Sequence, residues 1–438
     1  MNVAKGSGLT FGLKIVGMAI NYTLIWIMAR SMGTDAVGTF MLMISLCNII
    51  SIFAKLGFGN AILKFITQAR IKGKNIYSNL IFLKVTIIIL SINGIIGIAL
   101  YFLSPVIAVK IFNKPFLEPF IRLSAFSIFP MAFTHIAAAY LRGYKKIWQY
   151  TFLQDIGNDF FGLVFLISLL SLWPSEMLPV SSWVFGWCVM LLFSVYMLAR
   201  MPHTRMLKFR GWSTVRSWPL LKVSIPMMMT STFVFLLNWT DTFMVGIYKS
   251  TSEVGIYSSA SKVAAFTTIM ISANAVIAGP KIVAYFTEGQ MDNLKKLLTH
   301  SSFLISIFAI PVAILMMIFP TFILGLFGED FKEGKWVLII LSFAQIVNST
   351  TGLVGLALNM TGREVLMQNL MIATVVMNII LNMVLIPPYG IEGAAIATCI
   401  SLIFKNLSSF YFVKKHLGFY SVSLDFIRDK LNSYRKRK

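Results

Sequence analysis

Long apolar runs, separated by short polar breaks, occupy nearly the whole of this 438-residue chain. A helix needs about 20 largely apolar residues to cross a bilayer's hydrocarbon core, because each residue adds only about 1.5 Å of length. The runs reach this length, so the pattern predicts an all-α integral membrane protein. Twelve transmembrane helices are expected, over residues 8–30, 37–57, 80–103, 117–141, 148–172, 179–200, 219–246, 253–280, 299–320, 334–358, 366–387 and 390–413.

The polar breaks contain an internal repeat. The first break, SMGTDAVGTF (Ser31 to Phe40), has a relative in YKSTSEVGIY (Tyr248 to Tyr257), which lies 217 residues further along. A second pairing sets RGYKKIWQY (Arg142 to Tyr150) over TGREVLMQN (Thr361 to Asn369), at a shift of 219. Both pairings keep the same side of the membrane, which indicates two six-helix repeats in parallel orientation.

The repeat also predicts how the chain is divided. Repeats related by an axis along the membrane normal usually place the substrate between the halves, so a central cavity is expected. The matched glycines Gly38 and Gly255 permit close helix packing just inside the next span. The expected parts are an N-terminal six-helix lobe over 1–200, a basic cytoplasmic linker over 201–218, a C-terminal six-helix lobe over 219–413 and a basic cytoplasmic tail over 414–438.

Composition and charge support a membrane protein with a defined orientation. Only 12% of residues are charged and the mean hydropathy is +0.80, whereas soluble domains are about 25% charged. The net charge of +22 is spread over the connecting segments, with 26 Lys or Arg on one side and six on the other. Because Lys and Arg are retained in the cytoplasm, both termini are predicted to be cytoplasmic. No nucleic-acid partner is expected, and the basic tail is a candidate contact for anionic membrane lipids.

The sequence offers no pattern for a cofactor or a metal ion. Cys47, Cys188 and Cys399 lie in apolar runs at unrelated spacings, which indicates small buried hydrophobes. We find no Walker-type phosphate loop, paired metal motif or nucleophile elbow, so no cofactor is expected and ATP-driven transport by this chain alone is not expected. Lys14 interrupts the first apolar run and no cleavage pattern follows, so the first helix is expected to remain in the mature protein.

Lysines inside the predicted spans are candidates for a substrate site, because a charge at mid-helix costs about 2.5–3.5 kcal/mol on insertion scales. Lys262 lies nine residues into the span 253–280, Lys405 is about equally deep in the last span, and Lys14 is one to two turns into the first. An ammonium group in a partly desolvated cavity binds phosphate as a point charge. The alternative for each lysine is a charge pair with a neighbouring helix.

Acidic residues and a histidine are candidates for coupling transport to protons or cations. Asp155 and Asp159 are four residues apart and are expected to share a helix face, where they need a lysine, water or a proton. They form a proton or cation relay in one interpretation, and in the other they neutralise Lys14 across the cavity. His135, in the middle of the fourth span, is either a hydrogen-bonded core histidine or a proton carrier.

Asp241 is a further candidate for the cavity. It lies toward the outer end of the seventh span, and Lys262 on the next span is its candidate partner. No metal ligand set is expected among these residues.

Three segments resemble the multidrug, oligosaccharidyl-lipid and polysaccharide exporter superfamily, and within it the Wzx-type flippases of O-antigen and other polysaccharides. They are ARSMGTDAVGTF (Ala29 to Phe40), FAKLGFGNAILKFI (Phe53 to Ile66) and TDTFMVGIYKSTSEVGIYSSASKVA (Thr240 to Ala264). The 6+6 plan of twelve spans extends the resemblance over the whole chain. The resemblance implies two lobes around a central cavity and transport by alternating access.

The function implied by the resemblance is that of a flippase and not an enzyme. Its substrate would be a polyprenyl-diphosphate-linked oligosaccharide, such as an O-antigen repeat unit for lipopolysaccharide, carried across the bacterial inner membrane. Membrane lipids and polysaccharide assembly proteins are further candidate partners.

Two alternatives remain from the sequence. A drug/cation antiporter of the same superfamily would need an acidic cavity, which Asp155 and Asp159 keep open. A membrane-bound polysaccharide polymerase would need a long catalytic loop outside the membrane, but the longest predicted outer segment has about 16 residues.

Overall fold

A computed structural model of the chain describes residues 3–54, 62, 66, 75–144, 146–172, 175–201, 232–233 and 236–420. Within these residues the secondary structure is helical and contains no strand. The chain divides into two compact units, residues 1–255 and 256–438. The predicted linker, apart from Met201, and the predicted tail beyond Tyr420 lie outside the described residues.

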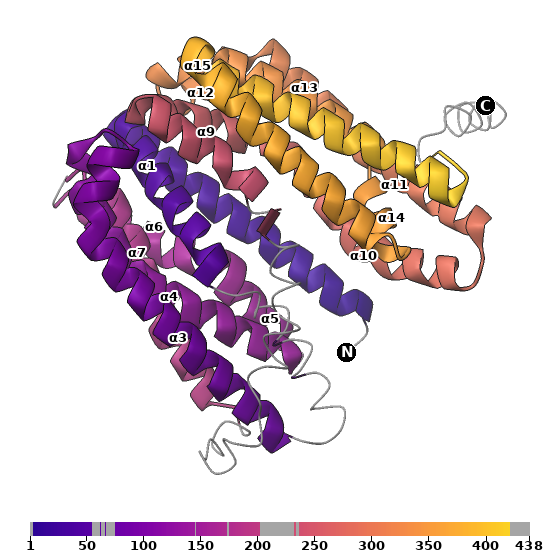
Figure 1. The fold of residues 1–438 in the computed structure, drawn as a ribbon, viewed down its shortest axis with the longest axis horizontal. Coiled ribbons are helices and arrows are strands. Elements are labelled where there is room, and N and C mark those ends of the chain that lie inside the picture. Colours follow the sequence, from indigo (N-terminus) through magenta and orange to yellow (C-terminus); the bar gives the residue numbers. More distant parts are fainter. Residues whose placement is uncertain are drawn as a thin grey trace. The chain divides into compact units, whose positions relative to one another are not determined.

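The first unit is built from long helices joined by short helical connections (Figure 1). It contains a helical segment at 236–248 and the first turn of α9 in addition to its named elements. These are α1 (Val3–Ala54), α3 (Asn75–Val106), the π-helix η1 (Ile107–Ile111), the 3₁₀-helix η2 (Pro115–Leu117), α4 (Glu118–Gly143), α5 (Ile147–Thr151), the π-helix η3 (Phe152–Ile156), α6 (Gly157–Leu170) and α7 (Leu178–Ala199).

The second unit continues from α9 to the end of the described chain. Its elements are α9 (Thr251–Ala265), the 3₁₀-helix η6 (Phe266–Thr268), α10 (Ile269–Thr287), α11 (Met291–Ile318), α12 (Pro320–Gly325), the 3₁₀-helix η7 (Asp330–Gly334), α13 (Lys335–Thr351), α14 (Val354–Met360) and α15 (Glu364–Leu417).

Two helices are long enough for two spans each, and each is broken at a glycine. In α1 the break is at Gly33 (φ 78°, ψ −173°), and in α15 it is at Gly390 (φ 60°, ψ −138°). Only glycine adopts such positive φ values without a steric penalty from Cβ. Gly33 lies inside the predicted break Ser31 to Phe40, so this break is a kink within otherwise helical structure.

The described helices account for eleven of the twelve predicted spans. Eight helices are long and apolar enough to cross a membrane, and the bent pair 330–351 and 354–360 makes nine. Counting α1 and α15 as two spans each raises nine to eleven. Most of the remaining predicted span, 219–246, lies outside the described residues.

Helix α4 forms the centre of the first unit. It packs against α3 and α7, and α7 also packs against α6 (Figure 1). The Tyr140 side chain of α4 is fully buried, and its hydroxyl donates a hydrogen bond of 2.6 Å to Oδ1 of Asn79 on α3. Small buried residues such as Ser124 and Ala137 allow neighbouring helices to approach α4 closely.

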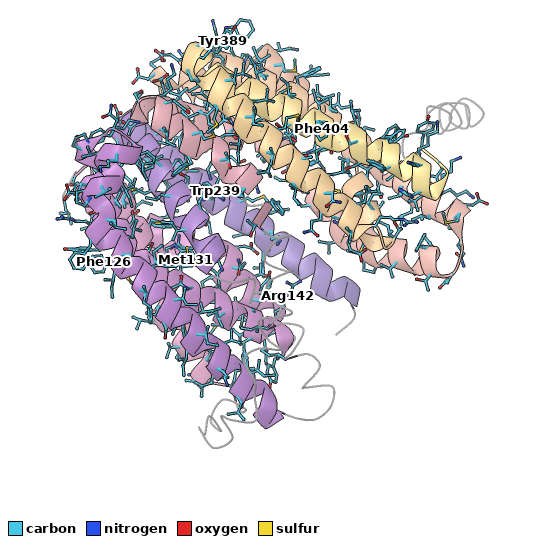
Figure 2. The ribbon with its side chains drawn as sticks, in the orientation of Figure 1. Phe126, Met131, Arg142, Trp239, Tyr389 and Phe404 are labelled. Carbon is cyan, nitrogen blue, oxygen red and sulfur yellow. The ribbon has the colours of Figure 1, made fainter. Side chains whose placement is uncertain are left out.

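Apolar side chains also cover the outside of both units, as expected for contact with lipid. Phe126 projects from α4 and is 61% exposed, whereas Met131 on the same helix is buried (Figure 2). In the second unit Tyr389 is similarly exposed (Figure 2). The expectation that all three cysteines are buried is wrong for Cys188, which is exposed on α7. The reason is that an apolar residue in a membrane helix is stable against lipid as well as in the protein core.

Candidate functional site

The N-terminal part of α1 packs against the fifth predicted span, which consists of α5, η3 and α6. Lys14, Gly17 and Asn21 follow one another at helical spacing along α1. A Cβ atom on Gly17 would lie 2.4 Å from the backbone oxygen of Asp155, so the two helices are in close contact there. Nδ2 of Asn21 donates a hydrogen bond of 2.8 Å to Oδ2 of Asp159. Asp155 and Asp159 therefore both lie on the part of the fifth span that meets α1.

The acidic pair is placed by a π-helical turn that the sequence did not indicate. Residues Phe152–Ile156 form this turn between α5 and α6, and they include Gln154 and Asp155. A π-turn inserts one extra residue into a helix, and such turns are rare and frequently mark functional sites. Asp155 in this turn lies against α1 at Gly17.

Lys14 and Asp155 interact electrostatically, without the close contact of an ion pair. The Asp155 side chain is half-buried, and its Oδ2 atom is buried with no hydrogen-bond partner. A buried carboxylate oxygen in this state is costly, because desolvation is not compensated by a donor. A proton, a cation or a water molecule at Oδ2 would offset this cost.

His135 on α4 contacts the same π-turn from the other side. Its Nδ1 atom lies 3.0 Å from Oε1 of Gln154, and its ring lies 5.4 Å from the ring of Trp187 on α7. Since an amide oxygen only accepts hydrogen bonds, Nδ1 is the donor in this arrangement. The predicted hydrogen-bonded histidine is present, and its role as a proton carrier stays a prediction.

The predicted cavity residues of the second unit are Lys262 on α9 and Lys405 on α15, and both side chains are half-buried. Lys405 precedes Asn406, whose Nδ2 atom donates a hydrogen bond of 3.1 Å to Oδ1 of Asn348 on α13. Asn348 in turn donates a bond of 2.9 Å to Gln345. Lys405 is thus next in sequence to a residue of an amide chain, and no described carboxylate forms an ion pair with it.

Asp241 lies in the helical segment 236–248 of the first unit and is 4% exposed. Its predicted partner Lys262 belongs to the second unit. A pair between Asp241 and Lys262 therefore stays a prediction, as does the central cavity that would contain the three lysines.

The repeated breaks contact each other within the first unit. Thr251 Oγ1 donates a hydrogen bond of 2.5 Å to Oδ1 of Asp35, and Ser252 Oγ donates one of 2.7 Å to Oγ1 of Thr34. A Cβ atom on Gly38 would lie only 1.7 Å from the backbone oxygen of Thr251. These residues form a repeat in the sequence, but the contact between them was not predicted from it. Their equal spacing and shared membrane side were a usable signal, because parallel repeats related by one axis can meet at that axis.

A lysine binds the chain at the start of the second repeated break. Nζ of Lys114 donates hydrogen bonds to the backbone oxygens of Gly246, at 2.5 Å, and of Lys249. These carbonyls end the helical segment 236–248, where cations are stabilised by the helix dipole. Burial lowers the pKa of Lys114 below its usual 10.5, and the nearby Glu253 carboxylate opposes this shift.

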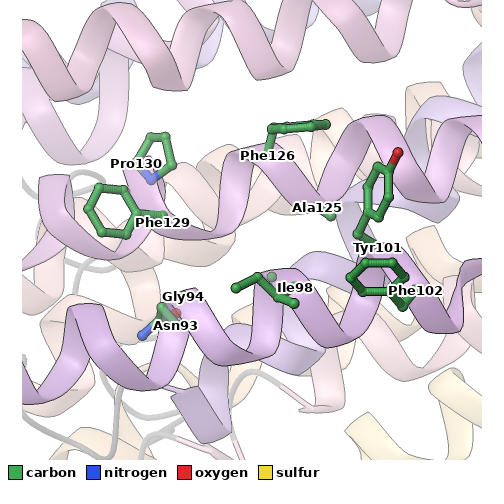
Figure 3. Close-up of a pocket in the computed structure, with 10 residues that line it drawn as sticks. Asn93, Gly94, Ile98, Tyr101, Phe102, Ala125, Phe126, Phe129 and Pro130 are labelled. Carbon is green, nitrogen blue, oxygen red and sulfur yellow. The ribbon is translucent and has the colours of Figure 1, made fainter.

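An apolar groove lies between α3 and α4, with a volume of about 460 Å³ (Figure 3). Ile98 and Phe102 of α3 and Phe126 and Phe129 of α4 line it. All four side chains are at least 40% exposed, so the groove faces the lipid side of the unit. It lacks the charged groups that a diphosphate would need.

All-helical membrane units that contain ionisable side chains within their spans are found in multi-pass secondary transporters, among other membrane proteins. Residues 3–285 match the family described as polysaccharide biosynthesis protein, and the chain belongs to this family. Residues 226–384 also match the MatE family model.

Two curated relatives come from the archaeon Haloferax volcanii. The chain is 27% identical over 434 residues to the "Probable low-salt glycan biosynthesis flippase Agl15", with 97% of this chain and 88% of the relative covered. It is 27% identical over 168 residues to the "Probable flippase AglR", with 38% of this chain and 35% of that relative covered. The similarity to Agl15 therefore extends over nearly the whole chain, and the similarity to AglR over part of it.

Solved structures show the same fold at low sequence identity. The lipid II flippase MurJ in an inward closed conformation has a TM-score of 0.73 at 15% identity, covering 93% of this chain and 87% of that one. An inward-facing multidrug resistance MATE transporter has a TM-score of 0.75 at 15% identity, covering 92% and 94%. These structures confirm the predicted all-α membrane fold, and the family matches together with them confirm the predicted superfamily.

Proposed function

We propose that the protein is a flippase that carries a polyprenyl-diphosphate-linked oligosaccharide across the plasma membrane by alternating access. Family membership supports a role in polysaccharide assembly, and the name of its relative Agl15 supports flipping of a glycan precursor. A transporter, rather than an enzyme, accounts for both. The narrower form of this proposal has an O-antigen substrate and the bacterial inner membrane. The general form is stated first, because both curated relatives are archaeal.

The observation that carries the proposal is Lys405. Its ammonium is half-buried in a membrane helix, and no described carboxylate pairs with it. An unpaired charge at this depth is costly, and an anionic substrate group offsets that cost when it binds. The diphosphate of a lipid-linked glycan is such a group, whereas an organic cation would be repelled.

Two carboxylates of the fifth predicted span interact with α1. Asp159 accepts a hydrogen bond from Asn21, and Asp155 is attracted by Lys14. These interactions offset part of the negative charge that a cationic substrate would need. We assign Lys14, Lys262 and Lys405 to the diphosphate, with Asp241 at the cavity edge.

Translocation of a fluorescent polyprenyl-diphosphate glycan in proteoliposomes tests this proposal. Lys405→Ala should slow flipping by about 10- to 100-fold, because a hydrogen bond to a charged group contributes about 1.5–3 kcal/mol. Lys405→Arg should retain part of the activity, since it keeps the charge. Lys415→Ala is the matched control, because Lys415 is exposed near the end of the same helix.

Flipping at the normal rate by folded Lys405→Ala would remove this residue from the substrate site. Absence of flipping by the unaltered protein would reject the proposed function itself.

A second candidate, the ion-coupled drug/cation antiporter, is supported by one observation, the buried Oδ2 atom of Asp155 without a donor. Proton-driven efflux of an organic cation that is lost in Asp155→Asn would favour it. In a flippase the same carboxylate would serve as the site of proton or cation coupling, together with Asp159 and His135.

A further inference from the structure

A pocket of about 540 Å³ opens beside the kink of α1, entirely within the first unit. Its volume is in the range of about 300–1,000 Å³ that is typical of small-molecule sites. It is lined by residues of the first repeated break, by Phe116 and Phe120, by Ser175 and Glu176, and by Thr251. All of these belong to the side of the membrane that the charge pattern predicts to be extracytoplasmic.

The pocket combines carboxylates, hydroxyls and aromatic rings. Asp35 and Glu176 are both exposed to the pocket, and no described basic side chain forms an ion pair with either of them. Asp35 accepts one hydrogen bond, from Thr251, through Oδ1 only. Because an ionised carboxylate accepts several hydrogen bonds, both residues retain capacity for hydroxyl donors of a ligand.

The rings supply the apolar part of the site. Phe116 is 52% exposed, whereas Phe120 is 6% exposed and forms the wall behind it. Ser31 and Ser175 add further hydroxyl groups at the pocket wall. A ligand that fits must therefore present both hydroxyls and an apolar face, as a pyranose ring does.

The charge of the pocket, and the number of its side chains that could bind a metal ion, restrict which molecules can bind there. Two carboxylates repel a phosphate or diphosphate, so the lipid-linked end of a substrate is disfavoured here. Within the described residues, no group of three His, Cys, Asp or Glu side chains that could hold a metal ion is found. An uncharged sugar satisfies the carboxylates by donating hydrogen bonds, which charged acceptors strengthen.

From these observations we infer that the pocket binds the sugar residues of the transported glycan on the extracytoplasmic side. This inference rests on the proposed function and assigns a separate site to the glycan, apart from the lysines assigned to the diphosphate. The pocket includes the hydrogen bond between Asp35 and Thr251, so a bound sugar would lie against the contact between the two repeated breaks.

The test uses the full chain in lipid nanodiscs and the free oligosaccharide released from the lipid-linked glycan of the flipping assay. Binding is measured by saturation-transfer difference NMR. Glu176→Gln should weaken binding by about tenfold, the effect of losing one charge-assisted hydrogen bond. Phe116→Ala should weaken it similarly, and because this side chain is half exposed the variant is expected to fold.

Glu333→Gln is the matched control, because Glu333 is an exposed carboxylate of the second unit. Equal binding by the unaltered protein and both pocket variants would overturn the inference, as would flipping without any oligosaccharide binding. Binding of calcium or an organic cation that is lost in Glu176→Gln, with no sugar binding, would make this a cation site instead. Failure of the proposed function is distinguished by absence of flipping in the unaltered protein, whatever the NMR result.

Discussion

Replacing Gly38 with alanine tests the contact between the two repeated breaks most directly. The added Cβ atom would lie 1.7 Å from the backbone oxygen of Thr251 and 2.9 Å from the backbone nitrogen of Gly255. Ordinary van der Waals contact begins at 3.4 Å, so the methyl group and the carbonyl cannot both keep their places. Because the obstacle is backbone, no side-chain rotation relieves the clash, and the helices must separate.

The expected loss in the free energy of unfolding can be estimated from the interactions that are disrupted when the two segments move apart. Overpacking a close contact costs about 1–3 kcal/mol. The hydrogen bonds from Thr251 to Asp35 and from Ser252 to Thr34 would be lengthened, and each contributes about 0.5–1.5 kcal/mol. We therefore expect Gly38→Ala to lower the free energy of unfolding of the first unit by about 2–6 kcal/mol. For a unit of this size, about 2–4 °C per kcal/mol converts this loss to a fall in Tm of about 4–24 °C.

The assay is thermal unfolding of the purified protein in one detergent, monitored by circular dichroism. Gly94→Ala is the matched control, because a Cβ atom on Gly94 of α3 would meet nothing within 4 Å. It should leave Tm unchanged or raise it slightly, since alanine favours a helix by about 1 kcal/mol over glycine. Equal Tm values for Gly38→Ala and the unaltered protein would refute the close contact, and Gly255→Ala should repeat the loss.

Two further predictions concern polar side chains of the first unit that donate hydrogen bonds. Lys114→Met should lower the free energy of unfolding by about 1–3 kcal/mol, because two backbone carbonyls lose their donor, whereas the exposed Lys110→Met should be neutral within about 0.5 kcal/mol. The folded-state pKa of Lys114 is lowered, so between that pKa and 10.5 the unfolded chain binds more protons than the folded chain. The stability of the unaltered protein relative to Lys114→Met should therefore increase as the pH rises through this range. A constant or falling difference between their free energies of unfolding in urea would contradict this. Tyr140→Phe should cost about 1–3 kcal/mol by leaving Oδ1 of Asn79 without this donor, and an unchanged denaturant midpoint would show that the bond does not contribute.

Much of the fold could be predicted from the sequence because the bilayer restricts the solutions. Only helices and closed barrels satisfy all backbone hydrogen bonds in hydrocarbon, so runs of about 20 apolar residues predict helices directly. The break at Ser31 to Phe40 was located correctly, although its extent was overestimated. A single residue, Gly33, suffices for the kink because its positive φ redirects the chain in one step.

The candidate site was predicted only as a set of residue types. Depth and charge identified Lys14, Asp155 and Asp159, because a charge inside a span needs a partner or a function. The partners themselves could not be predicted, since Asn21 bonds Asp159 across 138 residues of chain. The π-turn was also missed, because one extra residue in a helix leaves no mark on an apolar run that is already long enough to span.

The sequence by itself determined the class of protein, the repeat and the positions of charge within the spans, because these depend on local composition and on regular spacing. Only the tertiary structure decided that Gly17 brings α1 against Asp155, that Gly38 lies against Thr251, and that a polar pocket opens beside Gly33. The physical reason is the same in each case. Contacts between helices depend on which faces meet, and in an apolar chain the hydrophobic pattern does not distinguish a face toward lipid from a face toward protein.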